Sequence, residues 1–170
     1  MVRSVAAPVR AAPGSVIRPV VGVLDNLRSA LNVGTILRTA EGAGIAHLHL
    51  CGFTPTPENP KVAKTSLGAQ ESIGWTHHFD AIECAAALQA DGYELWAVEA
   101  APTSTPLFEV PRPGSDVRVA FIVGNEVDGV DAALLDIADR IVHLPMQGEK
   151  SSLNVGVAFG IAAYWLVFVP

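Results

Sequence analysis

The sequence is poor in charge, in aromatic side chains and in cysteine, and each shortage argues against a class of protein. Only 16% of the 170 residues are charged and only 6% are aromatic, whereas 50% are hydrophobic. The formal net charge of −6 argues against a protein that coats nucleic acid by charge alone, because phosphate contacts need lysine and arginine. The two cysteines, Cys51 and Cys84, form no close-spaced pair, so we predict reduced thiols in a cytoplasmic protein and no bound metal.

Several functional motifs are also missing. The chain has no Gly-x-Gly-x-x-Gly and no Gly-Lys-Ser/Thr, which argues against dinucleotide binding and P-loop NTPase chemistry. His77 and His78 are adjacent in a strand-like run, so they face opposite sides and make a poor pair of metal ligands. The most apolar stretch, 155–169, is shorter than the roughly 20 residues of a spanning helix, and we see no secretory signal. We therefore expect no membrane segment and no metal site.

Apolar runs alternate between strand-like and helix-like spacing along most of the chain. We predict one domain over 18–170, preceded by a flexible arm over 1–17. The predicted helices run from residue 31 to Gly42 or Gly44 and over 61–67, 81–90, 131–138 and 154–168, and residues 53–60 and 101–113 read as loops. The predicted strands are 20–24, 47–51, 75–79, 94–98, 118–123 and 140–144. This alternation predicts an α/β protein with a parallel sheet and helices on both faces.

Three short polar clusters interrupt the apolar surroundings: Asn32 to Arg38, Gly124-Asn125-Glu126, and Ser151-Ser152-Leu153-Asn154-Val155. Polar side chains held beside apolar runs lose water and need a partner or a ligand. The second and third clusters follow strands that end at 123 and 144. Ligands of parallel sheets bind beyond the carboxyl ends of the strands, so both loops should open on the same edge.

Taken one at a time, the clusters also have purely structural interpretations. Ser152 or Asn154 fits the N-cap of the last helix, and Asn125-Glu126 fits a turn that caps the helix near residue 131. Arg38 is placed to pair with Glu41 three residues on. The functional alternative is that Gly124 lets backbone approach a ligand closely while Glu126 orients a partner such as Arg38. The residues alone leave both interpretations open.

The order of the clusters is more specific than any one of them. Asn-x-Gly-x-x-x-Arg, then Gly-Asn-Glu, then Ser-Leu-Asn-Val resembles the three motifs of the SpoU/TrmH (SPOUT) family of RNA ribose methyltransferases. Residues 60–69 resemble the Lys-Thr-x-x-Gly-Ala stretch of that family, and the resemblance runs from about residue 20 to 168. It implies an α/β fold with a deep C-terminal trefoil knot, a homodimer, S-adenosylmethionine as cofactor, and methyl transfer to a ribose 2′-hydroxyl of tRNA or rRNA.

The resemblance also implies a set of site residues. The catalytic residues would be Arg38, Asn32, Glu126, Ser152 and Asn154. The cofactor would contact Val98, Glu99, Ala100, Gly124, Asn125, Glu126, Leu144, Pro145, Met146, Ser152, Leu153 and Asn154. A guanidinium stays protonated at neutral pH, so we interpret Arg38 as a clamp on phosphate and on the developing alkoxide rather than as a base.

No separate RNA-binding domain is visible in the sequence. We therefore expect RNA contacts from the dimer surface and from the basic residues Arg18, Arg28, Lys61 and Lys64. Two alternatives remain at this stage. One is a knotted RNA-binding module without catalysis, and the other is a methyltransferase that modifies a base, although the Ser-Leu-Asn ending favours the ribose.

Overall fold

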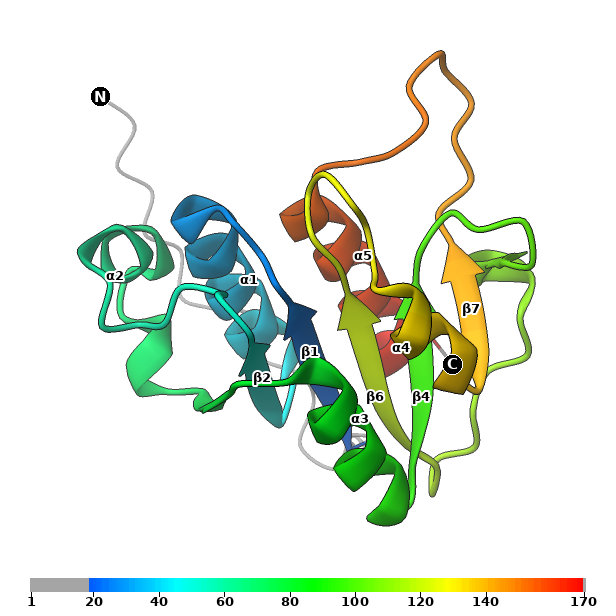
Figure 1. Cartoon of the computed structure of the whole chain (residues 1–170), viewed down its shortest axis with the longest axis horizontal. Coiled ribbons are helices and arrows are strands. Elements are labelled where there is room, and N and C mark those ends of the chain that lie inside the picture. Colours follow the sequence, from blue (N-terminus) through cyan, green and yellow to red (C-terminus); the bar gives the residue numbers. More distant parts are fainter. Residues whose placement is uncertain (1–18, 170) are drawn as a thin grey trace.

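The computed structural model describes residues 19–169, and in this part of the chain helices cover both faces of one parallel sheet (Figure 1). The sheet has seven strands in the order β3-β2-β1-β6-β4-β7-β5, and all the described pairings are parallel. The strands are β1 Val20–Asp25, β2 His47–Cys51, β3 Gly74–His78, β4 Tyr93–Val98, β5 Thr105–Pro106, β6 Arg118–Val123 and β7 Arg140–His143. The predicted α/β class is confirmed, whereas the predicted arm over 1–17 lies outside the described residues.

Successive side chains along the strands point to opposite faces of the sheet, so they form two apolar cores, one on each face. The helices are α1 Ala30–Ala43, α2 Pro60–Ser66, α3 Ala81–Ala90, α4 Ala132–Ile137 and α5 Val155–Phe168. Helices α1 and α5 cover one face, and α3 and α4 cover the other (Figure 1). Both faces of β1 are buried, which explains why its sequence reads as an uninterrupted apolar run.

Most predicted elements lie where the sequence places them, and the loop over 101–113 was wrong in part. The strands 47–51 and 118–123 and the helix 81–90 agree to the residue. Helix α1 continues through Gly42 and ends at Gly44, whose φ of 76° is the left-handed conformation that glycine adopts without strain. The predicted loop over 101–113 contains β5 and the 3₁₀ turn Leu107–Glu109.

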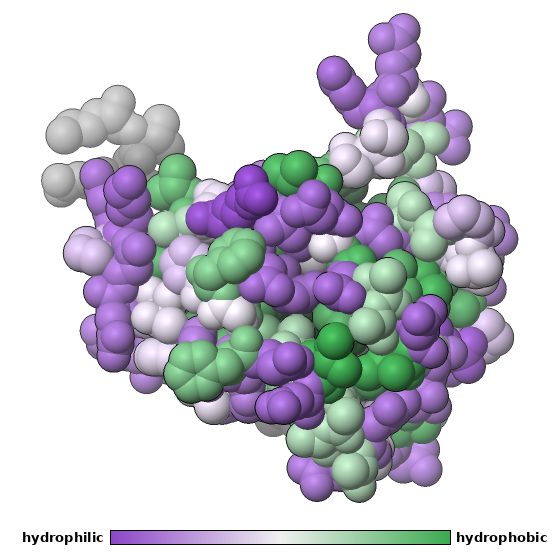
Figure 2. Space-filling model, viewed as in Figure 1, coloured by the Kyte–Doolittle hydropathy of each residue, from purple (hydrophilic) through white to green (hydrophobic). Residues whose placement is uncertain are grey.

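The loop between β7 and α5 stands clear of the body of the molecule (Figure 1). Its exposed residues include Gln147, Glu149 and Lys150, and Figure 2 shows it as a hydrophilic projection. Within 19–169, no helix combines the length and the apolar character that a bilayer crossing requires.

Candidate functional site

A cavity of about 400 Å³ lies beyond the carboxyl ends of β4, β6 and β7. Its wall comes from three segments, residues 98–100 after β4, 123–129 after β6, and 143–158 around the β7–α5 loop. The sequence therefore correctly predicted that the loops after 123 and 144 open on one edge. A volume of this size falls within the range of small-molecule sites, about 300–1,000 Å³.

The turn after β6 is closed by backbone contacts. Asn125 and Gly129 exchange two backbone hydrogen bonds, both of 2.9 Å. A Cβ on Gly124 would lie 2.2 Å from the carbonyl carbon of Gly129, so only glycine fits. The turn therefore requires glycine at this position, and Gly124 also lies in the wall of the cavity.

The Asn125 side chain joins the turn after β6 to the segment after β1. Its Nδ2 donates to the Asn26 carbonyl at 2.7 Å, and its Oδ1 accepts from the amides of Val127 at 2.8 Å and Asp128 at 3.2 Å. The residue is only 8% exposed, so these bonds replace the water that the amide has lost.

Two acidic side chains hold the end of this turn. Glu99 Oε2 accepts from the Val130 amide at 3.0 Å, and Asp25 Oδ2 accepts from the Asp131 amide at 3.1 Å. Burial raises the pKa of Asp25, and its hydrogen bonds from Asp131 and Asn26 only partly oppose that effect. Asp131 itself caps α4, so the alternative in which Asn125-Glu126 caps that helix was wrong.

The Glu126 carboxylate reaches from the β6 turn to the beginning of α1. Its Oε2 accepts from the Arg28 amide at 2.8 Å, while Oε1 accepts from the Ser29 amide at 3.0 Å and from Asn32 Nδ2 at 2.9 Å. A carboxylate is stabilised at this position because the first amides of a helix have no partner within the helix. Within one copy of the chain its partners are thus Asn32 and the α1 N-terminus rather than Arg38.

Opposing effects act on the ionisation of Glu126. Partial burial raises the pKa of Glu126, but the hydrogen bonds from the Arg28 amide, the Asn32 side chain and other backbone amides outweigh it. The net pKa is lowered, so the carboxylate is charged at neutral pH.

Asn154 brings the third cluster into the same network. Its Oδ1 caps α5 by accepting from the amides of Gly156 at 2.9 Å and Val157 at 3.4 Å, which confirms the predicted N-cap. Its Nδ2 donates to Asn32 Oδ1 at 3.1 Å. One chain of side-chain contacts, Glu126–Asn32–Asn154, therefore links the three polar clusters of the sequence.

The structure brings together most of the predicted site residues. Every residue predicted for the cofactor shell lines the cavity except Pro145 and Met146, which lie outside its wall. The sequence missed Val123, Val127, Gly129, His143, Ser151, Val155 and Ala158, which also line it. Most of these lie directly beside predicted residues, so extending the strand-end segments at both ends would have found them.

Arg38 lies apart from the other predicted catalytic residues. It is exposed on α1 and does not line the cavity. Among residues 19–169 Arg38 has no ion pair with Glu41, so the structural interpretation, in which these two residues pair, was wrong. Arg38 lies six helical steps after Asn32, so the two side chains point about 120° apart around the helix axis.

A second, more open hollow of about 830 Å³ lies beside the start of α1 and α2. Arg28, Lys61 and Lys64 line it, so three of the four cations predicted to contact RNA come together, whereas Arg18 lies outside the described residues. The Arg28 side chain lies 3.8 Å from Asp128 in an exposed pair. The two hollows adjoin, because Glu126 of the first binds the amides of Arg28 and Ser29 in the second.

Comparisons with known proteins agree with this geometry. Residues 19–164 match the model of the SpoU rRNA Methylase family. The chain is 33% identical over 144 residues to RlmP of Bacillus subtilis, a 23S rRNA guanosine 2′-O-methyltransferase, covering 85% of this chain and 56% of that protein. It is 32% identical to RlmB of Xanthomonas axonopodis, covering 86% of this chain and 57% of that protein. The chain thus spans little more than half the length of these relatives.

Two solved structures extend the comparison. An AdoMet-bound rRNA methyltransferase from Sinorhizobium meliloti superposes with a TM-score of 0.80 and 26% identity, covering 91% of this chain and 59% of that one. A structure that describes 2-OH methylation of C/U34 on tRNA superposes with a TM-score of 0.74 and 26% identity, covering 88% of this chain and 94% of that one.

Proposed function

This chain belongs to the SpoU rRNA Methylase family, and from that membership we propose that it transfers a methyl group from S-adenosylmethionine to a ribose 2′-hydroxyl of ribosomal RNA. One observation carries the proposal. The three polar clusters wall or adjoin a single cavity and are joined through Glu126, Asn32 and Asn154. The curated relatives RlmP and RlmB, both 23S rRNA 2′-O-methyltransferases, support the same reaction class.

The cavity fits S-adenosylmethionine in size and in chemistry. Apolar side chains such as Val98, Leu144 and Leu153 suit an adenine ring, and the carboxylates of Glu99 and Glu126 suit a cationic ligand. When bound, the cofactor supplies a methyl group already activated by its sulfonium, so the protein's task is to position the reactants. The hydrogen-bonded turn after β6, which Glu99 at the end of β4 also holds, keeps that part of the wall in place for the task.

Asn32 lies between the cavity and the hollow proposed to bind RNA, and its side chain is held in a fixed position. Its side chain accepts from Asn154 and donates to Glu126, so its position is fixed at both ends. It also lies at the start of α1, next to the hollow that Arg28, Lys61 and Lys64 line. We propose that these cations hold the RNA backbone while Asn32 and Ser152 direct the ribose toward the cavity.

We further propose that the active site is shared between two copies of the chain. Arg38 is exposed on α1 outside the cavity wall, so its predicted role as a clamp requires the cavity of a second copy. The helices α1 and α5 carry exposed apolar side chains that suit such contact, namely Leu31, Val157, Tyr164 and Phe168. Family membership also supports the predicted trefoil knot in the C-terminal part of the chain. We propose that this knot leaves the apolar side chains of α5 exposed for contact with the second copy.

A complementation assay tests the shared site. Arg38→Ala should leave cofactor binding intact and lower methyl transfer by orders of magnitude, whereas Asn154→Ala should damage the cavity. If each site uses Arg38 of one copy and Asn154 of the other, mixing the two inactive variants under exchange conditions should restore roughly a quarter of the activity. Mixtures that stay inactive despite proven exchange would place both residues in the same copy.

Labelling of RNA tests the reaction itself. The chain is incubated with radiolabelled S-adenosylmethionine and either ribosomal RNA or transfer RNA, and the labelled nucleotide is mapped. We expect label on a ribose 2′-oxygen of rRNA and saturable cofactor binding by calorimetry. No cofactor binding at millimolar concentration would contradict the enzyme and favour an RNA-binding module, and label on a base would contradict ribose chemistry.

Transfer RNA is a second candidate substrate, because the neighbour at TM-score 0.74 and 26% identity describes 2-OH methylation of C/U34 on tRNA. Label on tRNA and not on rRNA in the same assay would favour this candidate.

A further inference from the structure

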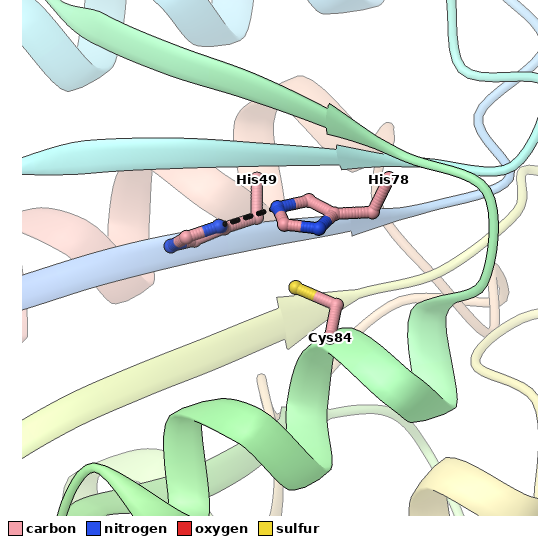
Figure 3. Close-up of side chains that lie close together, drawn as sticks. All are labelled: His49, His78 and Cys84. Carbon is pink, nitrogen blue, oxygen red and sulfur yellow. Dashed lines mark hydrogen bonds between the residues drawn. The ribbon is translucent and has the colours of Figure 1, made fainter.

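Two imidazoles and a thiol from three different elements converge on the side of the sheet that α3 covers. His49 lies on β2, His78 ends β3 and Cys84 lies on α3, and their ligand atoms are all within 4.8 Å of one another. Figure 3 shows both rings and the sulfur pointing toward the same space between the strands and the helix. His49 Nδ1 lies 3.0 Å from His78 Nε2.

Strand alternation and register bring the three groups together. His49 and Cys51 lie two residues apart on the same face of β2, and Cys51 pairs in register with His78 of β3. Helix α3 then covers this face with Cys84, which is 4% exposed. His77 points to the opposite face and binds the Gly52 carbonyl at 2.8 Å.

The separations are close to those of a tetrahedral zinc site. With Zn–N near 2.0 Å and Zn–S near 2.3 Å, tetrahedral ligands lie about 3.3 Å apart for two nitrogens and about 3.5 Å apart for nitrogen and sulfur. The two imidazole nitrogens are already at 3.0 Å, and no pair of ligand atoms needs to close by more than about 1.3 Å. Both histidines are only half-buried, so side-chain rotation supplies that movement.

We propose that His49, His78 and Cys84 bind a zinc ion, with water at the fourth position. Imidazole and thiolate are ligands that zinc accepts, whereas magnesium and calcium require oxygen. The ion ties α3 to β2 and β3. None of the three residues lines either hollow described above, so this inference does not depend on the proposed methyl transfer.

The sequence predicted no metal, and the reason is now visible. The three ligands are 29 and 6 residues apart along the chain, and they match no compact motif. Their proximity depends on the parallel pairing of β2 with β3 and on the docking of α3, which spacing alone does not reveal.

A cobalt titration tests the proposal on the reduced full chain. A non-chelating reductant keeps Cys51 and Cys84 as free thiols without competing for the metal. We expect one equivalent of Co²⁺ to produce the intense visible bands of a tetrahedral ion and a thiolate-to-cobalt charge-transfer band, both abolished by added Zn²⁺. Zinc at about 100 times its Kd should raise the Tm by roughly 5–10 °C, reversibly with chelator.

Matched variants assign the ligands. Cys84→Ser should abolish the charge-transfer band, and His78→Gln should weaken cobalt binding at least tenfold, whereas the adjacent His77→Gln should bind as the unaltered chain does. The proposal is overturned if the unaltered chain shows no charge-transfer band and no zinc-dependent Tm, or if Cys84→Ser keeps both. The titration of the unaltered chain decides the matter even where a ligand variant fails to fold.

Discussion

At the scale of single residues, Glu126 is the side chain that joins the β6 turn to α1. Replacing it by glutamine leaves one acceptor oxygen and places an NH₂ group against backbone amides that also donate. We expect Glu126→Gln to lower the free energy of unfolding by about 1–2 kcal/mol, measured by urea denaturation. Glu58→Gln, at an exposed glutamate without these contacts, is the matched control, and equal losses in both variants would contradict the role of the network.

The same carboxylate predicts a pH dependence. The folded-state pKa of Glu126 lies below its ordinary value of 4.5, so its contribution is fully present above pH 4.5 and is lost as pH falls through the lower folded-state pKa. The stability difference between the unaltered chain and Glu126→Gln should therefore be largest near neutral pH and shrink below pH 4.5. The raised pKa of Asp25 acts in the opposite direction, so only the difference between the two chains isolates Glu126. A difference that grows on acidification would refute the assignment.

At the scale of elements, the contact between α1 and α2 depends on a glycine. A Cβ on Gly34 would lie 2.6 Å from Thr65 Cβ and 2.8 Å from the Val62 carbonyl, whereas one on Gly42 would meet only the Tyr164 hydroxyl at 3.3 Å. Gly34→Ala should cost about 1–3 kcal/mol through overpacking. Gly42→Ala should be neutral or stabilising by up to about 1 kcal/mol, because alanine favours a helix. Thermal unfolding of both variants measures the contrast, and a neutral Gly34→Ala would show that α2 moves freely.

The elements also show how far the sequence alone can predict this structure. Buried strands and the alanine-rich α3 carry strong local patterns, and their predicted bounds agree with the structure. The two-residue strand β5 contains a proline and has no periodic signal. The Asn32–Glu126 contact joins residues 94 apart, whereas the sequence suggested Arg38 as the partner of Glu126. Such pairings depend on strand order, which local spacing does not encode.

At the scale of the whole molecule, the few cations must carry a large share of any RNA affinity, since the net charge is −6. We expect Lys61→Ala and Lys64→Ala each to lower the slope of log affinity against log salt by about 0.7 for single-stranded RNA. Arg118→Gln is the control, because Arg118 lies at the amino end of β6 and already binds the Asp91 carbonyl at 2.7 Å. Fluorescence anisotropy over a range of salt concentrations measures the slopes, and equal slopes in all variants would place the RNA elsewhere.

The proposed knot also makes a prediction for the whole chain. A trefoil that tightens under force retains residues that no longer contribute to extension, at up to about 3.6 Å each. Stretching the chain between residues 20 and 168 in optical tweezers should therefore release less length than the fully extended segment. Stretching between 20 and 117, which leaves out the C-terminal elements, should release the full length. Full extension in both experiments would mean an unknotted chain.

The projecting β7–α5 loop can be cut without releasing α5, because packing rather than the loop holds that helix in place. Trypsin has an exposed target there in Lys150, while α5 beyond it is anchored by the fully buried Phe159, Ala162 and Ala163. A nick at this point should leave two fragments that elute as one particle and separate only in denaturant. The loop is therefore the natural place to open the polypeptide or to graft a foreign peptide.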